Sequence, residues 1–414
     1  MEFKHTELDN GLTILGEVRQ EAQSMAMGFF VKTGARDETS EVSGVSHFLE
    51  HMMFKGTERR TAFEVSLEFD EMGAKYNAFT SEENTVYYAA VLPEYQERVL
   101  GLWADMMRPA LREEDFDTEK GVICEEIAMY KDQPQFDVVD RCRRLHFGEH
   151  KCGNSVLGTV ESVQALKVEQ MREYFARRYA PDNMVLACVG PMDWDRLVGQ
   201  AQELCGSWTA SQAGRKLSDF RGSNKEAKKS NEKVIREHIC LMSGGPAAQD
   251  ESRYAAGVLA NIIGDETGSR LYWALIETAL ADAADLEYEP MDGTGLFYAY
   301  ISCDPENADK VMEVVKMALT EVRLDGVTEQ ELVASKNKIA STATLHGELP
   351  MGRLVPLGAN WVYRKEYRSL AEEITAIESV GAEDVQRILE DYPLEKFSVF
   401  RLGPEPKPAA PENL

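Results

Sequence analysis

Two stretches far apart in the chain repeat the same order of features. Residues 161–191 read ESVQALKVEQMREYFARRYAPDNMVLACVGP, and residues 378–404 read ESVGAEDVQRILEDYPLEKFSVFRLGP. Each runs from Glu-Ser-Val through an amphipathic helix ending in Tyr to an apolar strand and Gly-Pro, and each closes one half of the chain, as in a duplicated domain. Two unrelated helix–strand units are the alternative, but the matched starts and ends favour duplication. The repeat predicts an α+β fold of two homologous α/β-sandwich domains, each an antiparallel sheet with helices.

The chain is long enough for two such domains. It has 414 residues, 43% of them hydrophobic, so each domain can form its own core. Residues 207–231 lose the apolar periodicity and are rich in Ser, Gly and Lys, which predicts a linker. We therefore expect one domain at 1–206, a second at 232–404, and a disordered, proline-rich tail at 405–414.

The first half carries clear signals for strands and helices. Asn10-Gly11 between two alternating runs predicts a β-hairpin, and residues 74–92 read as two strands joined by a polar turn at 81–84. Helices are expected at 44–55, 61–72, 94–107, 113–131 and 168–179.

Composition excludes several classes of function. The net charge of −26 argues against a nucleic-acid-binding protein or a protein of anionic membrane surfaces, since both need basic patches. No stretch approaches the roughly 18 apolar residues of a membrane span. Seven cysteines without CxxC pairs do not suggest a disulfide framework. A reducing compartment fits best, most simply a bacterial cytoplasm, although a mature organellar protein without its presequence would look the same.

A short motif in the first half points to metal chemistry. The segment SHFLEHMMFKGT, residues 46–57, places His47 and His51 one helical turn apart with Glu50 between them. On a helix both imidazoles share one face, where neutral histidines bind Zn²⁺ well and leave room for a third ligand and a water. Glu50 flanks them and can act as a general base. Two ordinary surface histidines are the alternative, but the chain has only seven histidines, which makes the pattern informative.

A catalytic zinc of this type needs a third ligand from another element. The segment 117–132, which covers most of the helix predicted at 113–131, offers Glu119 and Glu126, two turns apart and hence on one face, whereas Glu125 points about 100° away. We take Glu126 as the third ligand and Glu119 as a carboxylate that orients a ligating histidine. A Glu-rich helix is also typical of a solvated surface, so this step depends on a wider resemblance.

That resemblance is to a known family. HxxEH is the inverzincin motif. The segments GVSHFLEHMMFKGTERRT, EFDEMGAKYNAFTSEENTVYY and EKGVICEEI closely resemble the M16 metallopeptidases, in the branch of mitochondrial processing peptidase and its short bacterial relatives. The likeness is densest over 1–195 and continues more weakly to the final repeat. It implies that the chain forms half of an M16 clamshell and acts as a zinc endopeptidase on extended peptides or unfolded segments.

The resemblance also assigns roles to residues. His47, His51 and Glu126 would bind one Zn²⁺ per chain, Glu50 would activate water, and Glu119 would be the supporting carboxylate. A further four residues match the edge strand against which the family's extended substrates lie; they are Asn77, Ala78, Phe79 and Thr80. Main-chain hydrogen bonds to an added strand need little sequence specificity, which agrees with this role. Phe79 could instead belong to the core.

Other motifs compete less well. His146 and His150 are four residues apart, but Gly148 between them argues against a helical metal site, and their segment resembles a structural loop of the family. Residues 257–265, GVLANIIGD, take the place of HxxEH in the second half and offer no ligand. That half is predicted to be a non-catalytic copy. The rival function is a structural, assembly or peptide-binding subunit of the same fold, although such subunits usually have a degraded zinc motif.

One departure from the family bears on partners. Family members that cleave peptides usually carry an Arg and a Tyr seven residues apart in the second half, which grip the substrate. The matching positions here are Leu275 and Asp282, and neither side chain can donate the hydrogen bonds required. Short members build the clamshell from two chains. We therefore expect a dimer, and favour a heterodimer whose M16-like partner lacks the zinc motif and supplies the Arg/Tyr pair over a homodimer.

Overall fold

The computed structural model describes residues 1–218, 220 and 222–405. The chain forms two compact units, and each draws on three stretches of the sequence. Unit 1 comprises Met1–Ala128, Asn154–Leu217 and Ala340–Thr375. Unit 2 comprises Met129–Gly153, Ser218–Ile339 and the chain from Ala376 onward. Helices α4 (Glu113–Lys131), α11 (Glu329–Gly347) and α13 (Leu370–Glu378) have residues in both units.

Unit 1 is built on a six-stranded sheet with the order β1-β2-β6-β3-β5-β4. Strands β2 and β6 pair in parallel and all other neighbours are antiparallel. The strands are β1 (Glu2–Glu7), β2 (Thr13–Val18), β3 (Met25–Val31), β4 (Lys75–Thr80), β5 (Thr85–Val91) and β6 (Met184–Gly190). The central strands β3 and β6 are buried along their whole length because helices cover both faces of the sheet.

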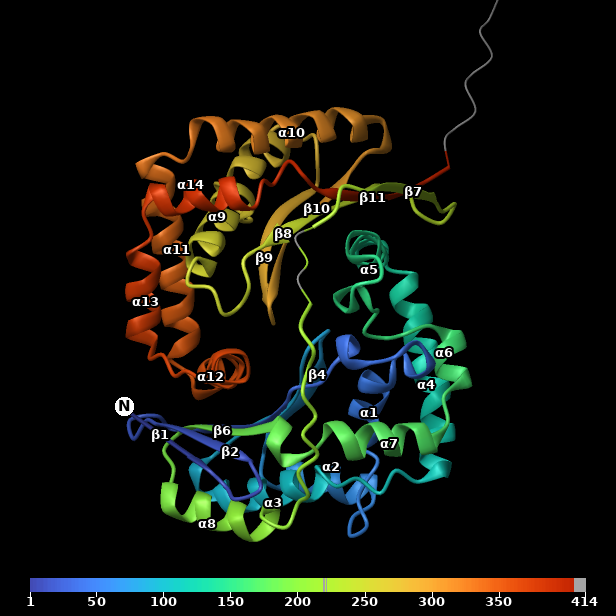
Figure 1. The fold of residues 1–414 in the computed structure, drawn as a ribbon, viewed down its shortest axis with the longest axis vertical. Helices are drawn as coiled ribbons and strands as arrows, with labels where there is room; N and C mark the ends of the chain where they lie inside the picture. Colours follow the sequence, from blue (N-terminus) through green and yellow to red (C-terminus); the bar gives the residue numbers. More distant parts are fainter. Residues whose placement is uncertain (219, 221, 406–414) are drawn as a thin grey trace, which may run out of the picture. The chain divides into compact units, whose positions relative to one another are not determined.

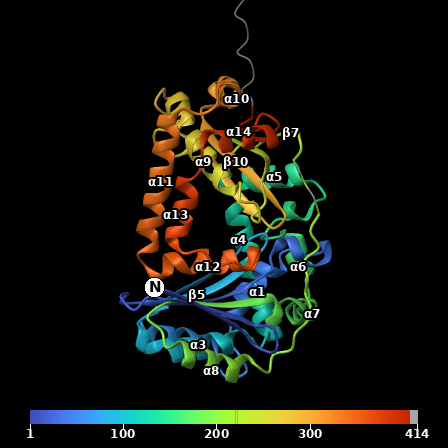
Figure 2. The ribbon, with the colours of Figure 1, turned by 60° about the vertical axis from the view of Figure 1, so that its left-hand side comes forward.

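Apolar side chains on the two faces of this sheet form two separate cores. On one face, residues such as Phe29 and Leu186 pack with α1, α2, α3, α7 and α8. On the other face, Leu354 and Leu357 of α12 pack with Phe30. Figure 2 shows α12 on one side of the sheet and α3 and α8 on the other. The helices are α1 (Val45–Met53), α2 (Ala62–Glu71), α3 (Gln96–Met106), α6 (Val160–Ala165), α7 (Val168–Arg178), α8 (Trp194–Cys205) and α12 (Pro350–Arg364).

Helix α12 is fixed to the sheet by a close approach and a buried ion pair. A Cβ atom at Gly358 would lie 2.4 Å from the ring of Phe30, so only glycine permits this contact. Arg353 donates to Glu17 on β2 at 2.8 Å, and both side chains are almost fully buried. A buried charge pair of this kind resists the loss of either partner, because the remaining charge would be unpaired.

Unit 2 contains a five-stranded sheet with the order β7-β11-β8-β10-β9. Its strands are β7 (Glu226–Ser230), β8 (Glu237–Gly245), β9 (Ala283–Met291), β10 (Thr294–Cys303) and β11 (Ser398–Gly403). Strand β7 is parallel to β11 and the other neighbours are antiparallel. Helices α9 (Arg253–Gly264), α10 (Ala308–Asp325) and α14 (Ala382–Asp391) pack on one face. Helix α5 (Pro134–Phe147) packs on the other, as Figure 1 shows.

The predicted duplication is confirmed by the topology. Strands β2, β3, β4, β5 and β6 of unit 1 correspond in order and direction to β7, β8, β9, β10 and β11 of unit 2. The first repeated sequence supplies α6, α7 and β6, whereas the second supplies α14 and β11 and includes only the last residue of α13, Glu378. The two halves also exchange a helix, because α5 belongs to unit 2 and α12 to unit 1. The expected boundaries at 206 and 232 do not anticipate this exchange and stay a prediction.

Most expected elements are present close to their predicted bounds. Gly11 has a φ of +89° in the hairpin between β1 and β2, and β4 and β5 flank the turn at 81–84 as predicted. The stretch predicted as a linker holds one element, because residues 226–230 form β7. This strand lies at the sheet edge with most side chains exposed, which explains its lack of apolar periodicity. The predicted tail lies, beyond residue 405, outside the described residues. Among the described helices, none has the length and hydropathy to span a membrane.

Candidate metal centre

Helix α1 separates its apolar and polar side chains into two faces. The buried apolar residues recur at helical spacing and anchor the helix in the core of unit 1; they are Val45, Phe48, Leu49, Met52 and Met53. His47, Glu50 and His51 lie on the remaining face at spacings of three and four residues. The sequence thus fixes the helix by its apolar residues and directs the polar residues to a common side.

The start of α1 is held by a carboxylate from a preceding loop. Glu38 accepts the backbone N–H of Gly44 at 2.7 Å and that of Ser46 at 2.8 Å, satisfying two donors at the helix N-terminus. Gly44 has a φ of +90° and its Cβ would lie 2.7 Å from Leu157 O, so glycine is required there. Burial raises the pKa of Glu38 to about 8 despite these hydrogen bonds. Glu38 sets where α1 begins and hence where its histidines lie.

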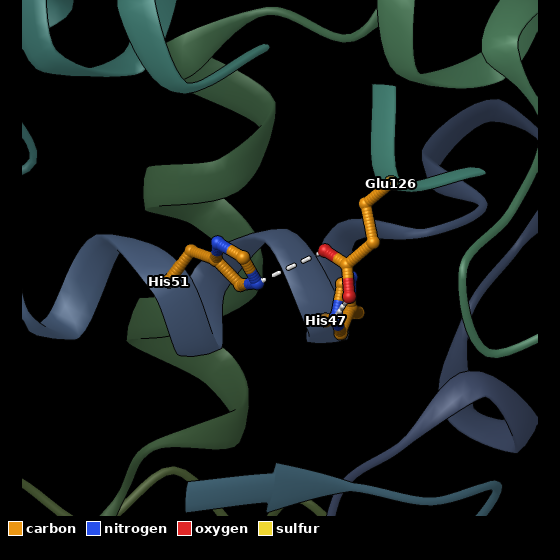
Figure 3. Close-up of side chains that lie close together, drawn as sticks. All are labelled: His47, His51 and Glu126. Atoms are coloured by element: carbon orange, nitrogen blue, oxygen red, sulfur yellow. Dashed lines mark ion pairs between the residues drawn. The ribbon is translucent and has the colours of Figure 1, made fainter. Parts of the chain in front are cut away.

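Three side chains converge beside α1, as Figure 3 shows. Glu126 of α4 lies with Oε2 3.4 Å from Nε2 of His51 and with Oε1 3.7 Å from Nε2 of His47. The candidate ligand atoms all lie within 4.8 Å of one another. Within the described parts of the chain, this is the one group of histidine, cysteine and acidic side chains that could hold a metal ion. The structure therefore brings together the three residues predicted as ligands.

A second carboxylate supports the cluster from behind. Glu119, two turns before Glu126 on α4, places Oε1 2.9 Å from Nδ1 of His51 and Oε2 2.5 Å from Nζ of Lys55. Glu119 is 3% exposed, so its charge depends on these two partners. With Nδ1–H donating to Glu119, Nε2 of His51 is the nitrogen that faces Glu126 and would bind a metal. This is the tautomer that a metal-binding histidine needs.

The donor set fits Zn²⁺. Two ligand atoms bound tetrahedrally at roughly 2.0–2.1 Å from zinc lie about 3.3–3.4 Å apart, close to the separations between Glu126 and the two histidines. Two imidazoles and one carboxylate match the ligand set of catalytic zinc sites with an open position. His47 Nδ1 is buried and has no hydrogen-bond partner among the described residues.

The charges at the site are suited to a bound cation. Burial and the nearby charge of His51 lower the pKa of His47 to about 4, so this ring is neutral. Burial lowers the pKa of His51, but its bonds with Glu119 and Glu126 outweigh this and raise it to about 9. The hydrogen bond from His51 lowers the pKa of Glu126. Two carboxylates thus hold a positive charge at His51, which a bound metal would take over when the ring is deprotonated.

Glu50 lies beside the cluster and is held by strand β4. Its Oε2 accepts a hydrogen bond of 2.6 Å from the hydroxyl of Thr80. Burial raises the pKa of Glu50, although the Thr80 hydrogen bond lowers it. A carboxylate with an elevated pKa next to a metal site is suited to accept and return a proton near neutral pH.

The residues predicted as the substrate edge strand lie in β4, the outermost strand of the sheet. Asn77 and Phe79 are exposed, whereas Ala78 is buried. The exposed Phe79 does not support the alternative that it is a core residue. Asn77 Oδ1 accepts the backbone N–H of Ala78 at 2.9 Å, which indicates that this N–H faces the open edge of the sheet rather than β5.

Other residues considered from the sequence lie elsewhere. Glu125 is exposed, as expected. His146 is buried, with Nδ1 3.2 Å from Ser398 Oγ, and His150 Nε2 lies 3.3 Å from Ser218 O, so both side chains serve the structure of unit 2. Leu275 is fully buried in the core of unit 2 and Asp282 pairs with Arg236.

Comparison with known sequences shows the protein family of the chain. Residues 13–160 match the family described as Insulinase (Peptidase family M16), and residues 165–339 match the family described as Peptidase M16 inactive domain. The chain belongs to peptidase family M16. The first match includes both site helices α1 and α4, and the second includes α9, which lacks their ligands.

Bacterial relatives in family M16 match the chain over nearly its whole length. A protein of Bacillus subtilis named uncharacterized zinc protease YmxG is 31% identical, covering 96% of this chain and 98% of the relative. An uncharacterized zinc protease of Streptomyces coelicolor is also 31% identical, covering 97% and 89%. The fold matches a protease from Helicobacter pylori with a TM-score of 0.90 at 20% identity, covering 97% of this chain and 100% of that one. A putative M16-like peptidase from Alicyclobacillus acidocaldarius gives 0.83 at 22%, covering 98% of each.

Two residues beside the candidate metal centre, Lys55 and Glu38, escaped the sequence-based predictions, and Thr80 was predicted for the substrate strand but not for its contact with Glu50. Lys55 follows His51 by four residues, so helical spacing could have placed it near Glu119. Thr80 alternates with the exposed Phe79, and this alternation could have directed its side chain inward toward α1. Glu38 lies in a loop, and no local pattern in the sequence connects it with the start of α1.

Proposed function

We propose that this chain is a zinc-dependent endopeptidase that cleaves extended peptides or unfolded protein segments. The observation that carries the proposal is the convergence of His47, His51 and Glu126 beside Glu50, next to the open edge of a sheet. Family membership and the names of the bacterial relatives support the same reaction class.

Each residue of the site has a distinct role in this proposal. His47, His51 and Glu126 hold the metal, and Glu119 keeps His51 in its ligating tautomer through the 2.9 Å bond to Nδ1. When bound, Zn²⁺ supplies a Lewis acid that lowers the pKa of water and polarises the scissile carbonyl. Glu50 accepts the proton of the attacking water and returns it to the leaving amine. Lys55 keeps the buried Glu119 ionised by charge pairing.

Substrate would bind as an added strand along β4. Ser81 donates its N–H to Asn84 O at 2.8 Å, and the alternation of the β4–β5 pairing then directs the backbone groups of Ala78 and Thr80 toward the open edge. An incoming peptide would replace the side chain of Asn77 at the N–H of Ala78. The exposed ring of Phe79 would contact the side chains of the peptide. Such binding depends on the main chain, so it suits extended segments of varied sequence.

A single series of measurements tests this function. Purified protein is assayed for zinc by elemental analysis and for cleavage of a quenched fluorescent peptide, before and after chelation and with zinc restored. Glu50→Gln should keep zinc and lose cleavage, because the change removes the base and leaves the ligands. Glu125→Gln, on the exposed side of α4, is the matched control and should cleave normally.

Each of the other outcomes would indicate a different function for this chain. Near-normal turnover by Glu50→Gln would remove Glu50 from its role. A zinc-loaded wild type that binds the peptide without cleaving it would be a peptide-binding subunit. A chain that takes up no zinc would be a structural or assembly subunit of the M16 fold.

We also propose that the active form is a dimer, with a heterodimer favoured over a homodimer. Leu275 is part of the core of unit 2 and Asp282 pairs with Arg236, so neither is available to grip a substrate. A partner of the same fold without a zinc motif would supply the Arg/Tyr pair. Co-purification from the native host, with activity measured for the isolated chain and the complex, tests this. Full activity of an isolated homodimer would contradict it.

We place this activity in the bacterial cytoplasm. The relatives named above are bacterial, and an odd number of cysteines without CxxC pairs suits a reducing compartment. Fractionation of the native host, followed by detection of the chain, tests the placement. Recovery outside the cytoplasmic fraction would contradict it.

A further inference from the structure

The short contact between Thr80 and Glu50 joins two elements that are distant in the sequence. Thr80 is the last residue of β4, and Glu50 lies on α1. The distance of 2.6 Å from Thr80 Oγ1 to Glu50 Oε2 is that of a strong hydrogen bond to a carboxylate. An ionised carboxylate only accepts hydrogen bonds, so the hydroxyl must be the donor when Glu50 acts as a base.

The neighbouring hydroxyl leaves the proton of Thr80 available for this bond. Thr85, which is opposite Thr80 in the β4–β5 pairing, donates its own proton to Thr33 O at 3.0 Å. The two threonine oxygens are 3.5 Å apart, a much weaker contact than the bond to Glu50. The single proton of Thr80 is therefore directed to Oε2 of Glu50.

The turn after Thr80 is anchored firmly to the rest of unit 1. Arg36 donates its backbone N–H to Glu82 O at 2.7 Å, and its side chain forms an ion pair with Glu83, which is 3% exposed. Tyr363 of α12 donates to Glu83 Oε2 at 2.9 Å. Gly34 faces the turn, and its Cβ would lie 2.3 Å from Ser81 O. The hydroxyl is thus presented by a turn that cannot shift without breaking buried charge pairs.

We propose that Thr80 is a positioning residue that orients the carboxylate of Glu50 for proton transfer. By holding Oε2, the hydroxyl leaves Oε1 as the oxygen that takes the proton. Threonine suits this task because its branched Cβ restricts χ1, so the hydroxyl keeps one direction. The assignment of Thr80 to the substrate strand concerns its backbone, whereas this role belongs to its side chain. The inference rests on the proposed peptidase function.

Two substitutions at Thr80 distinguish the effect of its hydroxyl from the effect of its side-chain shape. Thr80→Val keeps the branched shape and the strand but removes the donor. We expect kcat to fall about 10–100-fold, with KM and zinc content close to wild type, because misplaced catalytic groups lose rate on this scale. Thr80→Ser keeps the donor and should recover most of kcat.

The outcomes separate this proposal from the proposed function. Wild-type kcat in Thr80→Val, or an equal loss in Thr80→Val and Thr80→Ser, would overturn the role of the hydroxyl while the wild type still cleaves. A rise in KM without a fall in kcat would make Thr80 a substrate contact instead. A zinc-loaded wild type that does not cleave the peptide would overturn the peptidase function itself, and this proposal with it.

Discussion

Helices α1 and α9 occupy corresponding places in the two units but differ completely in chemistry. Each follows a central strand, β3 or β8, and precedes the two strands at the far side of its sheet. Helix α1 carries His47, Glu50 and His51. Helix α9 reads RYAAGVLANIIG and contains no histidine, cysteine or acidic residue. The duplicated fold therefore does not by itself bring candidate metal ligands together; a few side chains at fixed positions do.

Helices α4 and α11, which contact α1 and α9, also occupy corresponding places in the two halves of the chain. Lys120 of α4 donates to the carbonyls of Gln164 and Leu166, and Lys336 of α11 makes the same pair of bonds to Glu378 and Val380. These matched contacts show that Lys120 of α4 corresponds to Lys336 of α11. The preceding residue is Glu119 in α4 and Ser335 in α11, and both are buried.

These two residues need different partners because one is a carboxylate and the other is a neutral serine. Glu119 binds His51 and Lys55, whereas Ser335 donates to Val258 O of α9 at 3.2 Å. A buried carboxylate requires charged partners, while a serine needs one backbone acceptor. At this matched position unit 1 thus has a buried charge, whereas unit 2 has a small neutral residue.

The largest effect is expected from removing a ligand in unit 1. His51→Ala and Glu126→Ala should each lower zinc affinity by more than about 100-fold, above the range for residues that only support a ligand. Competition with a chelator of known affinity measures this. Glu125→Ala, one residue before Glu126 and exposed, should bind zinc normally.

Normal binding by Glu126→Ala would break the ligand assignment. The third ligand would then have to be sought at Glu119 or Glu125, and the separations between Glu126 and the histidines would have no bearing on zinc.

A smaller effect is expected when Glu119 of unit 1 is replaced by serine, the residue at the matching position of unit 2. Glu119→Ser should lower zinc affinity about 10–100-fold, because the ligands remain but His51 loses the partner that fixes its tautomer. The same chelator competition measures it, with Glu125→Ser as control. Unchanged affinity would show that the bond between Glu119 and His51 serves only the packing of α4 on α1.

The corresponding change in unit 2 should affect stability alone. Ser335→Ala removes the bond to Val258 O and should cost about 0.5–1.5 kcal/mol of folding free energy without changing zinc content. Urea unfolding and elemental analysis measure the two quantities, with the exposed Ser341→Ala on the same helix as control. A loss of zinc in Ser335→Ala would mean that unit 2 contributes to metal binding.

The smallest difference is expected between the matched lysines. Lys120→Met and Lys336→Met each lose two bonds to backbone carbonyls, so their costs in stability should agree within about 0.5 kcal/mol. Urea unfolding measures both. A much larger cost at one position would show that the two contacts are not equivalent.

The sequence predicted much of this site because its geometry follows from helical spacing. His47 and His51 are one turn apart, and Glu119 and Glu126 are two turns apart, so each pair shares a helix face wherever the helix packs. The turn at 81–84 was likewise readable, since polar residues interrupt two apolar runs. The resemblance to M16 peptidases then selected Glu126 over its neighbours.

Other features depend on tertiary structure that local patterns do not encode. Helices α5 and α12 are amphipathic, but nothing in their spacing indicates that each packs on the sheet of the other half. The bond between Glu38 and the start of α1 joins a loop to a helix, and the contact from Tyr363 to Glu83 joins residues far apart in the chain. Such contacts become visible only when the fold brings their elements together.

The number of zinc ions bound per chain decides whether one unit of the duplicated fold, and not both, binds the metal. Elemental analysis of the purified chain, dialysed against metal-free buffer, should give one equivalent of zinc. The His47→Ala variant, assayed in parallel, should give close to none, because unit 2 offers no replacement ligands in α9. Two equivalents in the wild type, or one equivalent retained in His47→Ala, would contradict the account.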